Sequence, residues 1–159
     1  MNPAAALLVI VLLVAATAGI GLVWRGRQGR LLSAGRTSHS TTVTAAELGL
    51  PGGGADAVPV FGTVATLVQF STELCVRCPG TRVLLGQVAD AHPGVRHLDI
   101  DLTQRVDLAR RFNVLQTPTT LVLDGAGRVR ARIGGVPNRD ALHAHLDDLV
   151  GPPPNLEPR

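Results

Sequence analysis

The chain has 159 residues, of which 45% are hydrophobic, 3% aromatic and 17% charged, and its formal net charge is +3. Once an anchor and a linker are set aside, this length leaves room for one domain of about 100 residues with its own hydrophobic core. From residue 64 onward, eleven arginines stand against ten acidic residues, so most of the positive charge lies near the N-terminus. A nucleic-acid partner is therefore not expected.

Residues 4–24 form an uncharged apolar stretch, AAALLVIVLLVAATAGIGLVW. A helix of this length crosses about 30 Å of hydrocarbon, so we predict a transmembrane anchor within residues 1–26. A cleaved signal peptide is the competing interpretation, because residues 16–18 (ATA) resemble a cleavage site. No Lys or Arg precedes the stretch, and the stretch continues to Trp24. Both features favour an anchor that is not cleaved from the protein.

The flanking charges predict the orientation of this anchor. Arg25, Arg27, Arg30 and Arg36 follow the apolar stretch with no acidic residue among them. Because basic flanks stay on the cytoplasmic side, we expect a single-pass protein of the plasma membrane, which contacts the bilayer through residues 4–24. Its soluble domain is then cytoplasmic.

Residues 27–62 have the composition of a flexible linker. They are rich in Gly, Ser, Thr and Ala, and they contain a Pro-Gly-Gly-Gly break at residues 51–54. Within them, residues 44–47 (TAAE) have the spacing of a capping box and predict a short helical turn, which either docks on the domain or interrupts the linker. Residues 151–159 are expected to be a disordered tail.

Residues 63–150 alternate between short apolar runs and longer amphipathic stretches, which predicts an α/β domain. The order of expected elements is β-α-β-α-β-β-α, typical of a mixed sheet with helices on both faces. The expected strands are 65–70, 95–101, 119–123 and 128–133, and the expected helices are 76–91, 104–112 and a last helix capped by Asn138.

The only two cysteines, Cys75 and Cys78, follow the first expected strand of this domain. A thiol at a helix start faces unpaired backbone N–H groups and the positive end of the helix dipole, which favour the thiolate. We therefore expect Cys75 to be a nucleophile, with Arg77 adding to the effect. Cys78, predicted to lie one turn into the helix, would be the resolving thiol.

With these features, residues 63–150 resemble the thioredoxin family. The signals are an apolar strand leading to CxxC at a helix start, Thr117-Pro118 further along the chain, and a closing hairpin plus helix. The resemblance implies a thioredoxin-like fold, a cis peptide bond before Pro118, and substrate pairing with the backbone at Thr117. A substrate peptide would also contact the rim formed by Leu74, Val76 and Arg77.

The chain departs from the pattern of this family at several positions. Leu74 stands where thioredoxins usually have Trp, and Val76-Arg77 stand where they have Gly-Pro. The buried Asp that assists the resolving thiol is matched by Gln69, which accepts no proton at neutral pH. His97 matches its Lys partner, and Val83 matches a helix-kinking Pro. We therefore expect the chain to be a thioredoxin-like protein and not a housekeeping thioredoxin.

Other interpretations of the cysteine pair remain open. A structural disulfide is disfavoured by the expected cytoplasmic location. A zinc site needs four ligands, and no second cysteine pair follows. A copper-handling site would need His92 or His97 to complete it.

The predicted function is that of a membrane-tethered thiol-disulfide oxidoreductase in cell redox homeostasis. Its Cys75/Cys78 dithiol would exchange disulfides with protein or low-molecular-weight partners and be recharged by an unidentified reductant, with no bound cofactor or metal. One alternative is a non-catalytic binding or scaffold module at the membrane. Another, if the topology is inverted, is an extracytoplasmic thiol reductase in protein or cytochrome maturation.

Overall fold

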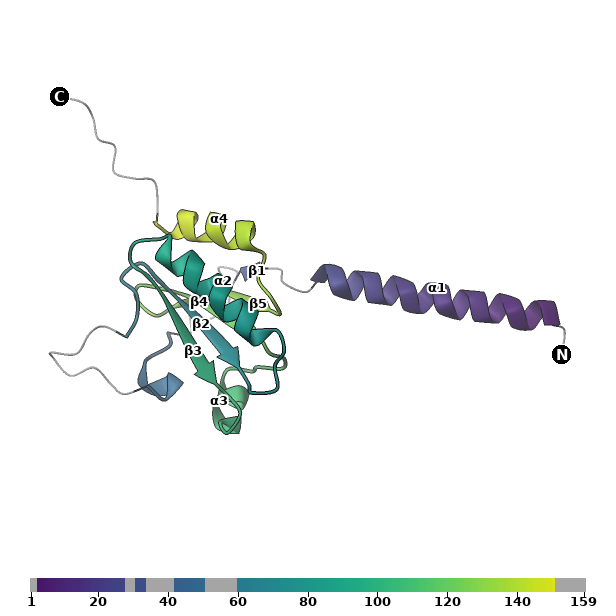
Figure 1. The fold of residues 1–159 in the computed structure, drawn as a ribbon, viewed down its shortest axis with the longest axis horizontal. Helices are drawn as coiled ribbons and strands as arrows, with labels where there is room; N and C mark the ends of the chain where they lie inside the picture. Colours follow the sequence, from purple (N-terminus) through teal and green to yellow (C-terminus); the bar gives the residue numbers. More distant parts are fainter. Residues whose placement is uncertain (1–2, 28–30, 34–41, 51–59, 151–159) are drawn as a thin grey trace, which may run out of the picture.

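The computed structural model describes residues 3–27, 31–33, 42–50 and 60–150 (Figure 1). Its strands are β1 (Leu31–Ser33), β2 (Ala65–Ser71), β3 (Val95–Asp101), β4 (Thr119–Asp124) and β5 (Val129–Gly134). Its helices are α1 (Pro3–Arg27), the 3-10 helix η1 (Ala46–Leu48), α2 (Cys78–Asp90), α3 (Val106–Arg111) and α4 (Arg139–Val150). The order predicted for residues 63–150 is therefore confirmed.

The described strands form one mixed sheet in the order β1-β5-β4-β2-β3. Strands β2 and β3 are parallel because α2 carries the chain across the sheet between them, whereas the other neighbouring pairs are antiparallel. The turn between β4 and β5 is the predicted hairpin, in which Asp124 accepts backbone hydrogen bonds from Ala126 and Arg128, both 2.9 Å long. Gly127 supplies a positive φ of 76° there.

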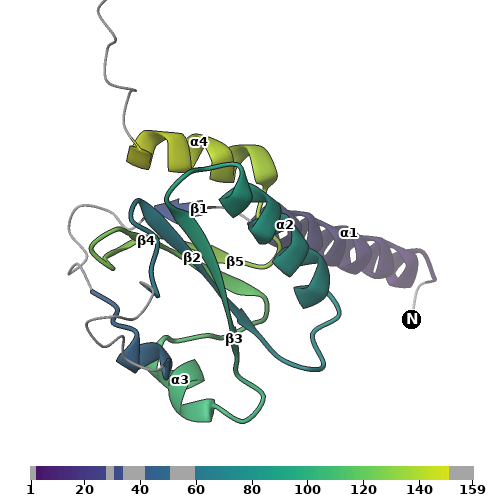
Figure 2. The same ribbon diagram turned by 60° about the vertical axis from the view of Figure 1, so that its left-hand side comes forward.

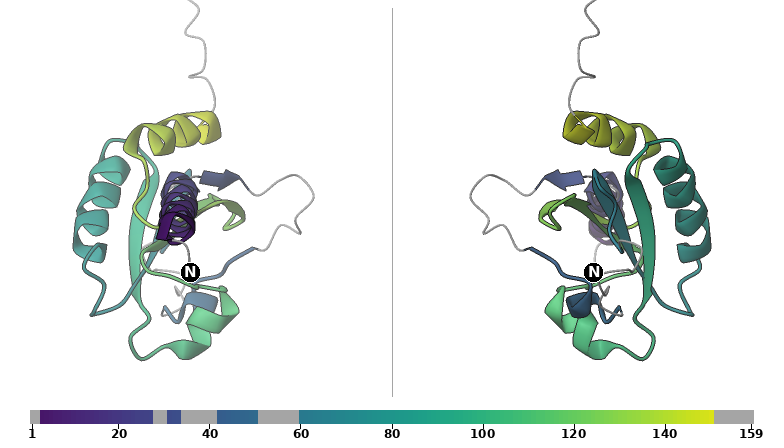
Figure 3. Two further views of the ribbon diagram at one scale, coloured as in Figure 1. Left: turned by 90° about the vertical axis from the view of Figure 1, so that its right-hand side faces the viewer. Right: turned by 90° about the vertical axis from the view of Figure 1, so that its left-hand side faces the viewer.

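Helices cover both faces of the sheet, and each face has its own hydrophobic core (Figure 2 and Figure 3). On one face, Leu67 of β2 packs with Leu85 of α2 and Leu146 of α4. On the other face, Phe70 of β2 packs with Leu108 of α3 and Leu48 of η1. Successive residues of β2 point to opposite faces, and both faces are covered, so this central strand is buried along its whole length.

The N-terminal apolar stretch is helical and extends away from the sheet in Figure 1. Among the described residues, however, no helix combines the length and hydropathy of a membrane span. The prediction of a transmembrane helix over residues 4–24 is therefore not supported by the structure.

The predicted linker over residues 27–62 contains more structure than its composition suggested. Strand β1 pairs with β5 at the edge of the sheet, and Val43 and Leu48 are each only 2% exposed. The expectation of a flexible spacer is wrong for residues 42–50, because these two side chains complete the core beneath α3. Residues 28–30, 34–41 and 51–59 of the predicted linker, and the predicted tail over 151–159, lie outside the described residues.

Two predicted helix caps are present. Thr44 and Glu47 exchange reciprocal hydrogen bonds, with Thr44 N donating to Glu47 Oε2 over 2.9 Å and Glu47 N donating to Thr44 Oγ1 over 3.3 Å. At the start of α4, Ala141 N donates to Asn138 Oδ1 over 2.9 Å. The docked alternative for the turn at residues 44–47 is the one observed, since Leu48 of η1 lies in the core.

Candidate redox site

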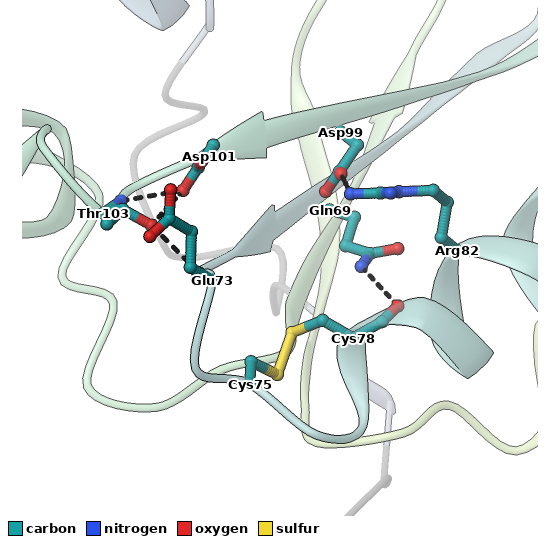
Figure 4. A network of polar contacts seen from close by, with 8 residues as sticks. All are labelled: Gln69, Glu73, Cys75, Cys78, Arg82, Asp99, Asp101 and Thr103. Carbon is teal, nitrogen blue, oxygen red and sulfur yellow. Dashed lines mark hydrogen bonds and ion pairs between the residues drawn. A yellow bond between two sulfur atoms is a disulfide. The ribbon is translucent and has the colours of Figure 1, made fainter.

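The two cysteines are joined by a disulfide bond between the end of β2 and the start of α2 (Figure 4). Their Cα atoms are 5.4 Å apart, within the normal range for a disulfide. The central strand β2 ends at Ser71, and a short loop then delivers Cys75 to the N-terminus of α2. The sheet and the helix together therefore hold the sulfur atoms at one edge of the domain.

Helix α2 begins later than predicted, at Cys78 instead of about residue 76. Cys78 N donates to Cys75 O over 3.1 Å, so residues 75–78 form a turn and not the first turn of the helix. Pro79, which occupies the first turn of α2, has no N–H to donate and has a φ that suits a helix start. Cys78 is thus the first helical residue, and the prediction that it lies one turn deeper is wrong.

The two sulfur-bearing residues differ in exposure. Cys75 is half-buried, whereas Cys78 is 2% exposed and lies against the sheet. A partner's disulfide would therefore meet Cys75 first. This difference fits the expected division of roles, with Cys75 as the attacking thiol and Cys78 as the resolving one.

Apolar side chains stand out into solvent on both sides of Cys75. Leu74 is 94% exposed and Val76 is 93% exposed, and Arg77 is exposed beside them. The residues expected to form the rim beside Cys75 are therefore exposed to solvent. Leu115, 87% exposed, lies two residues before Thr117 and was not anticipated from the sequence.

The peptide bond between Thr117 and Pro118 is cis, as predicted. Thr117 is half-buried and its Oγ1 lies 3.3 Å from Oγ1 of Thr72, in the loop that carries the cysteines. Pro118 is buried, and its carbonyl oxygen accepts a hydrogen bond of 2.8 Å from Gly135 N. The Thr72–Thr117 contact brings the cysteine loop and the cis-proline loop together, although no sequence motif marks Thr72.

Gln69 lies directly beneath the start of α2. Its side chain is fully buried, and its Nε2 donates a hydrogen bond of 3.1 Å to the carbonyl oxygen of Cys78 (Figure 4). The amide therefore donates to a backbone carbonyl at the helix start, a contact that an ionised carboxylate at this position could not make because it has no donor.

A charged pair lies beside Gln69. Asp99 of β3 forms an ion pair with Arg82 of α2, and the register of the sheet places Asp99 next to Gln69. Burial lowers the pKa of His97, two residues earlier on β3, with Arg82 adding to this effect and Asp99 opposing it. The net shift of the pKa favours the neutral imidazole.

Metal binding finds no support in the part of the chain that the structure describes. No three His, Cys, Asp or Glu side chains come together there as a metal site would require. In particular, neither His92 nor His97 joins the cysteines in such a group, and His92 instead contacts Asp147 over 3.3 Å.

Similar solved structures are thioredoxins. Over 58% of this chain and 80% of its own length, a mutant thioredoxin from Halobacterium salinarum NRC-1 superimposes with a TM-score of 0.50 at 20% identity. Mitochondrial thioredoxin 3 from Saccharomyces cerevisiae, in its oxidised form, has a TM-score of 0.47 at 24% identity over 54% of this chain and 79% of its own. No family model and no curated protein matches the sequence. The match to the Halobacterium salinarum structure, at 20% identity, shows the thioredoxin-like fold alone.

Proposed function

We propose that this protein is a thiol-disulfide oxidoreductase that works through Cys75 and Cys78. The proposal rests on the Cys75–Cys78 disulfide at the N-terminus of α2, in which Cys75 is half-buried and Cys78 is buried. The positive end of the helix and its unpaired N–H groups favour a thiolate at Cys75 in the reduced form. The chemistry requires no cofactor.

The reaction begins when the Cys75 thiolate attacks a partner's disulfide, which forms a mixed disulfide and releases one partner thiolate. Cys78 then attacks the sulfur of Cys75, closes the internal disulfide and releases the second partner thiolate. The partner gains two electrons and the two cysteines lose them. A dithiol or low-molecular-weight thiol must supply two electrons to start the next cycle.

This function is tested by the reduction of insulin disulfides with dithiothreitol, with and without the full chain. The proposal predicts that catalytic amounts of the chain accelerate the reduction in proportion to their concentration. If the chain binds insulin but leaves the rate at background, the protein is a binding module with a thioredoxin-like fold.

The rim beside Cys75 would accept an extended, apolar segment of a protein partner. Replacing Leu74 and Val76 together by serine should raise KM for a disulfide-containing apolar peptide about tenfold, because the loss of about two buried CH₂ groups in a partly buried contact, at about 0.8 kcal/mol each, has this effect. The rate with a small disulfide should stay unchanged. Val106→Ser, which alters an apolar residue that is 57% exposed on α3, serves as the control. An equal loss toward both substrates would contradict a role in peptide binding.

We propose further that the N-terminal helix attaches the protein to the plasma membrane, with the domain in the cytoplasm. The support comes from the sequence: residues 4–24 are uncharged, and four arginines follow with no acidic residue among them. Alkaline carbonate washing of membranes from expressing cells should leave the full chain in the pellet, and Leu12→Arg should shift it to the supernatant. Full release of the unaltered chain by this wash would contradict the attachment.

A further inference from the structure

The cysteine loop, between β2 and α2, is tied on one side to the residues that follow β3. Ser71 O accepts a hydrogen bond of 2.8 Å from Leu102 N, and Glu73 N donates to Thr103 Oγ1 over 3.0 Å (Figure 4). In the chain, these two bonds lie directly before and directly after Thr72. The main chain next to Thr72 is therefore fixed against the end of β3.

On its other side, the cysteine loop contacts the cis-proline loop through the side chain of Thr72. Thr72 Oγ1 and Thr117 Oγ1 are 3.3 Å apart, and either hydroxyl can donate to the other. Both residues are only half-buried. Water can reach both side chains, so neither hydroxyl depends on the other to be satisfied. The contact therefore contributes little to the stability of the fold.

Thr72 also contacts the attacking cysteine directly. Its carbonyl oxygen accepts a hydrogen bond of 3.1 Å from Cys75 N. One residue thus bonds to Cys75 through its main chain and to Thr117 through its side chain. A displacement of Thr117 away from Cys75 therefore stretches one of these two bonds.

The cis-proline loop is anchored to β5 and to the residue that follows this strand. Arg132 of β5 donates to Asn113 O over 2.6 Å, and Gly135 N donates to Pro118 O over 2.8 Å. Thr117 lies between these two anchors, on the part of the loop that reaches the cysteine loop. The anchors hold the ends of the loop, and the hydroxyl contact holds the part between them.

A polypeptide partner would contact both loops. Thr117 lies next to the cysteine loop, and Leu115, two residues before it, is 87% exposed. A chain that presents its disulfide to Cys75 would therefore lie against the cis-proline loop as well. A small disulfide, by contrast, needs only the exposed side of Cys75. The separation between the two loops thus matters for one class of substrate and not for the other.

Resting on the proposed function, we propose that Thr72 is a positioning residue for polypeptide partners. Its hydroxyl holds Thr117 at a fixed separation from Cys75, so that the two loops bind a partner chain as one surface. A preformed surface loses less conformational entropy when the partner binds, which strengthens binding. Thr72 acts through Thr117, and it favours polypeptide disulfides over small ones.

Steady-state reduction of two substrates by the full chain, with dithiothreitol as the reductant, tests this role. One substrate is an apolar peptide closed by a disulfide, and the other is hydroxyethyl disulfide. Thr72→Val, which replaces the hydroxyl by a methyl group, should raise KM for the peptide about fivefold, the effect expected from the loss of one neutral hydrogen bond. Both kcat for the peptide and kcat/KM for hydroxyethyl disulfide should stay unchanged, because only binding of the longer substrate is affected.

Two further substitutions show whether the hydroxyl contact itself is responsible. Thr72→Ser keeps the hydroxyl and should retain the KM of the parent. Thr117→Val should raise KM for the peptide as much as Thr72→Val does, and it tests the same contact if Thr72→Val fails to fold. The double variant should raise KM no further, because one contact is lost in all three. Multiplied effects in the double variant, or a Thr72→Ser variant that behaves like Thr72→Val, would overturn the inference.

Thr103→Val is the matched control. It removes a hydroxyl that also bonds to the cysteine loop, at Glu73 N, but from the β3 side. KM for the peptide should therefore stay close to that of the parent. An increase equal to that of Thr72→Val would mean that any loosening of the cysteine loop weakens binding, which contradicts a specific role for Thr72. If the parent reduces neither substrate above background, the proposed function itself fails. If only the effect of Thr72→Val is missing, the inference fails alone.

Discussion

Cys75→Ser should reduce catalysed insulin reduction to the background rate, and Cys78→Ser should trap the partner on Cys75. The first variant loses the sulfur that is reachable from solvent, so no mixed disulfide forms. The second keeps the attacking thiol but lacks the buried thiol that would release the partner. Mass spectrometry under non-reducing conditions should detect one covalently attached partner on Cys78→Ser and none on Cys75→Ser.

The reverse pattern would overturn the assignment of roles to the two cysteines. If Cys75→Ser captured the partner through Cys78, the more buried sulfur would be the nucleophile, and the exposure of the two residues would be a poor guide. Val83→Ala, on the exposed side of α2, is the control that changes the same helix without touching either cysteine.

Phe70→Ala should destabilise the domain by about 3–5 kcal/mol, the usual cost of removing a fully buried aromatic side chain from a core. Phe70 is 0% exposed and its ring centroid lies 5.2 Å from that of Phe112. It lies on the central strand and faces the side of the sheet that α3 covers, so the cavity would open in the core on that face. Urea unfolding followed by circular dichroism measures the change.

Val83→Ala provides the comparison for this measurement too, since Val83 is 60% exposed. Its effect on the free energy of unfolding should stay within about 0.5 kcal/mol. If Phe70→Ala lowered the free energy of unfolding by less than about 1 kcal/mol, the core on the α3 face would contribute little to stability. This result would contradict the burial of Phe70.

The alternation of elements was predictable because each element of residues 63–150 buries a clear apolar face. Strand β2 is a continuous run of buried residues, and the strand at 95–101 has the predicted bounds. Local chemistry also predicted the caps, since Asn138 and the Thr44–Glu47 pair bond as their spacing requires. Both kinds of signal involve residues only a few positions apart, so they can be recognised in the sequence without knowledge of the fold.

Long-range packing explains the errors. Residues 42–50 have a linker-like composition, yet Val43 and Leu48 enter the core, and Val43 N donates to Gly127 O over 2.7 Å. These two buried side chains dock the segment on the domain. The average composition of residues 27–62 does not reveal them, because most of these residues are small or polar. The start of α2 was missed by two residues, although Pro79 directly after Cys78 is a signal for a helix start.

The redox site was predictable in its cysteines and in the cis bond before Pro118, but not in its polar surroundings. Comparison with the thioredoxin pattern identified Gln69 as a lost carboxylate. The position of Asp99 beside Gln69 emerges only from the register of the sheet, because 30 positions separate the two residues in the sequence. The sequence also gives no sign that Nε2 of His97 is buried without a hydrogen-bond partner among the described residues.

The most direct test of a working Cys75/Cys78 redox centre is a redox titration of the full chain in graded thiol/disulfide buffers. Free thiols are alkylated at each point, and the added mass reports the fraction reduced. We expect one reversible two-electron transition with a midpoint between about −120 and −270 mV, the range spanned by known exchange catalysts. The midpoint would distinguish a reductase from an oxidant. A disulfide that stays closed throughout this range, or a dithiol that never closes, would contradict the proposed function.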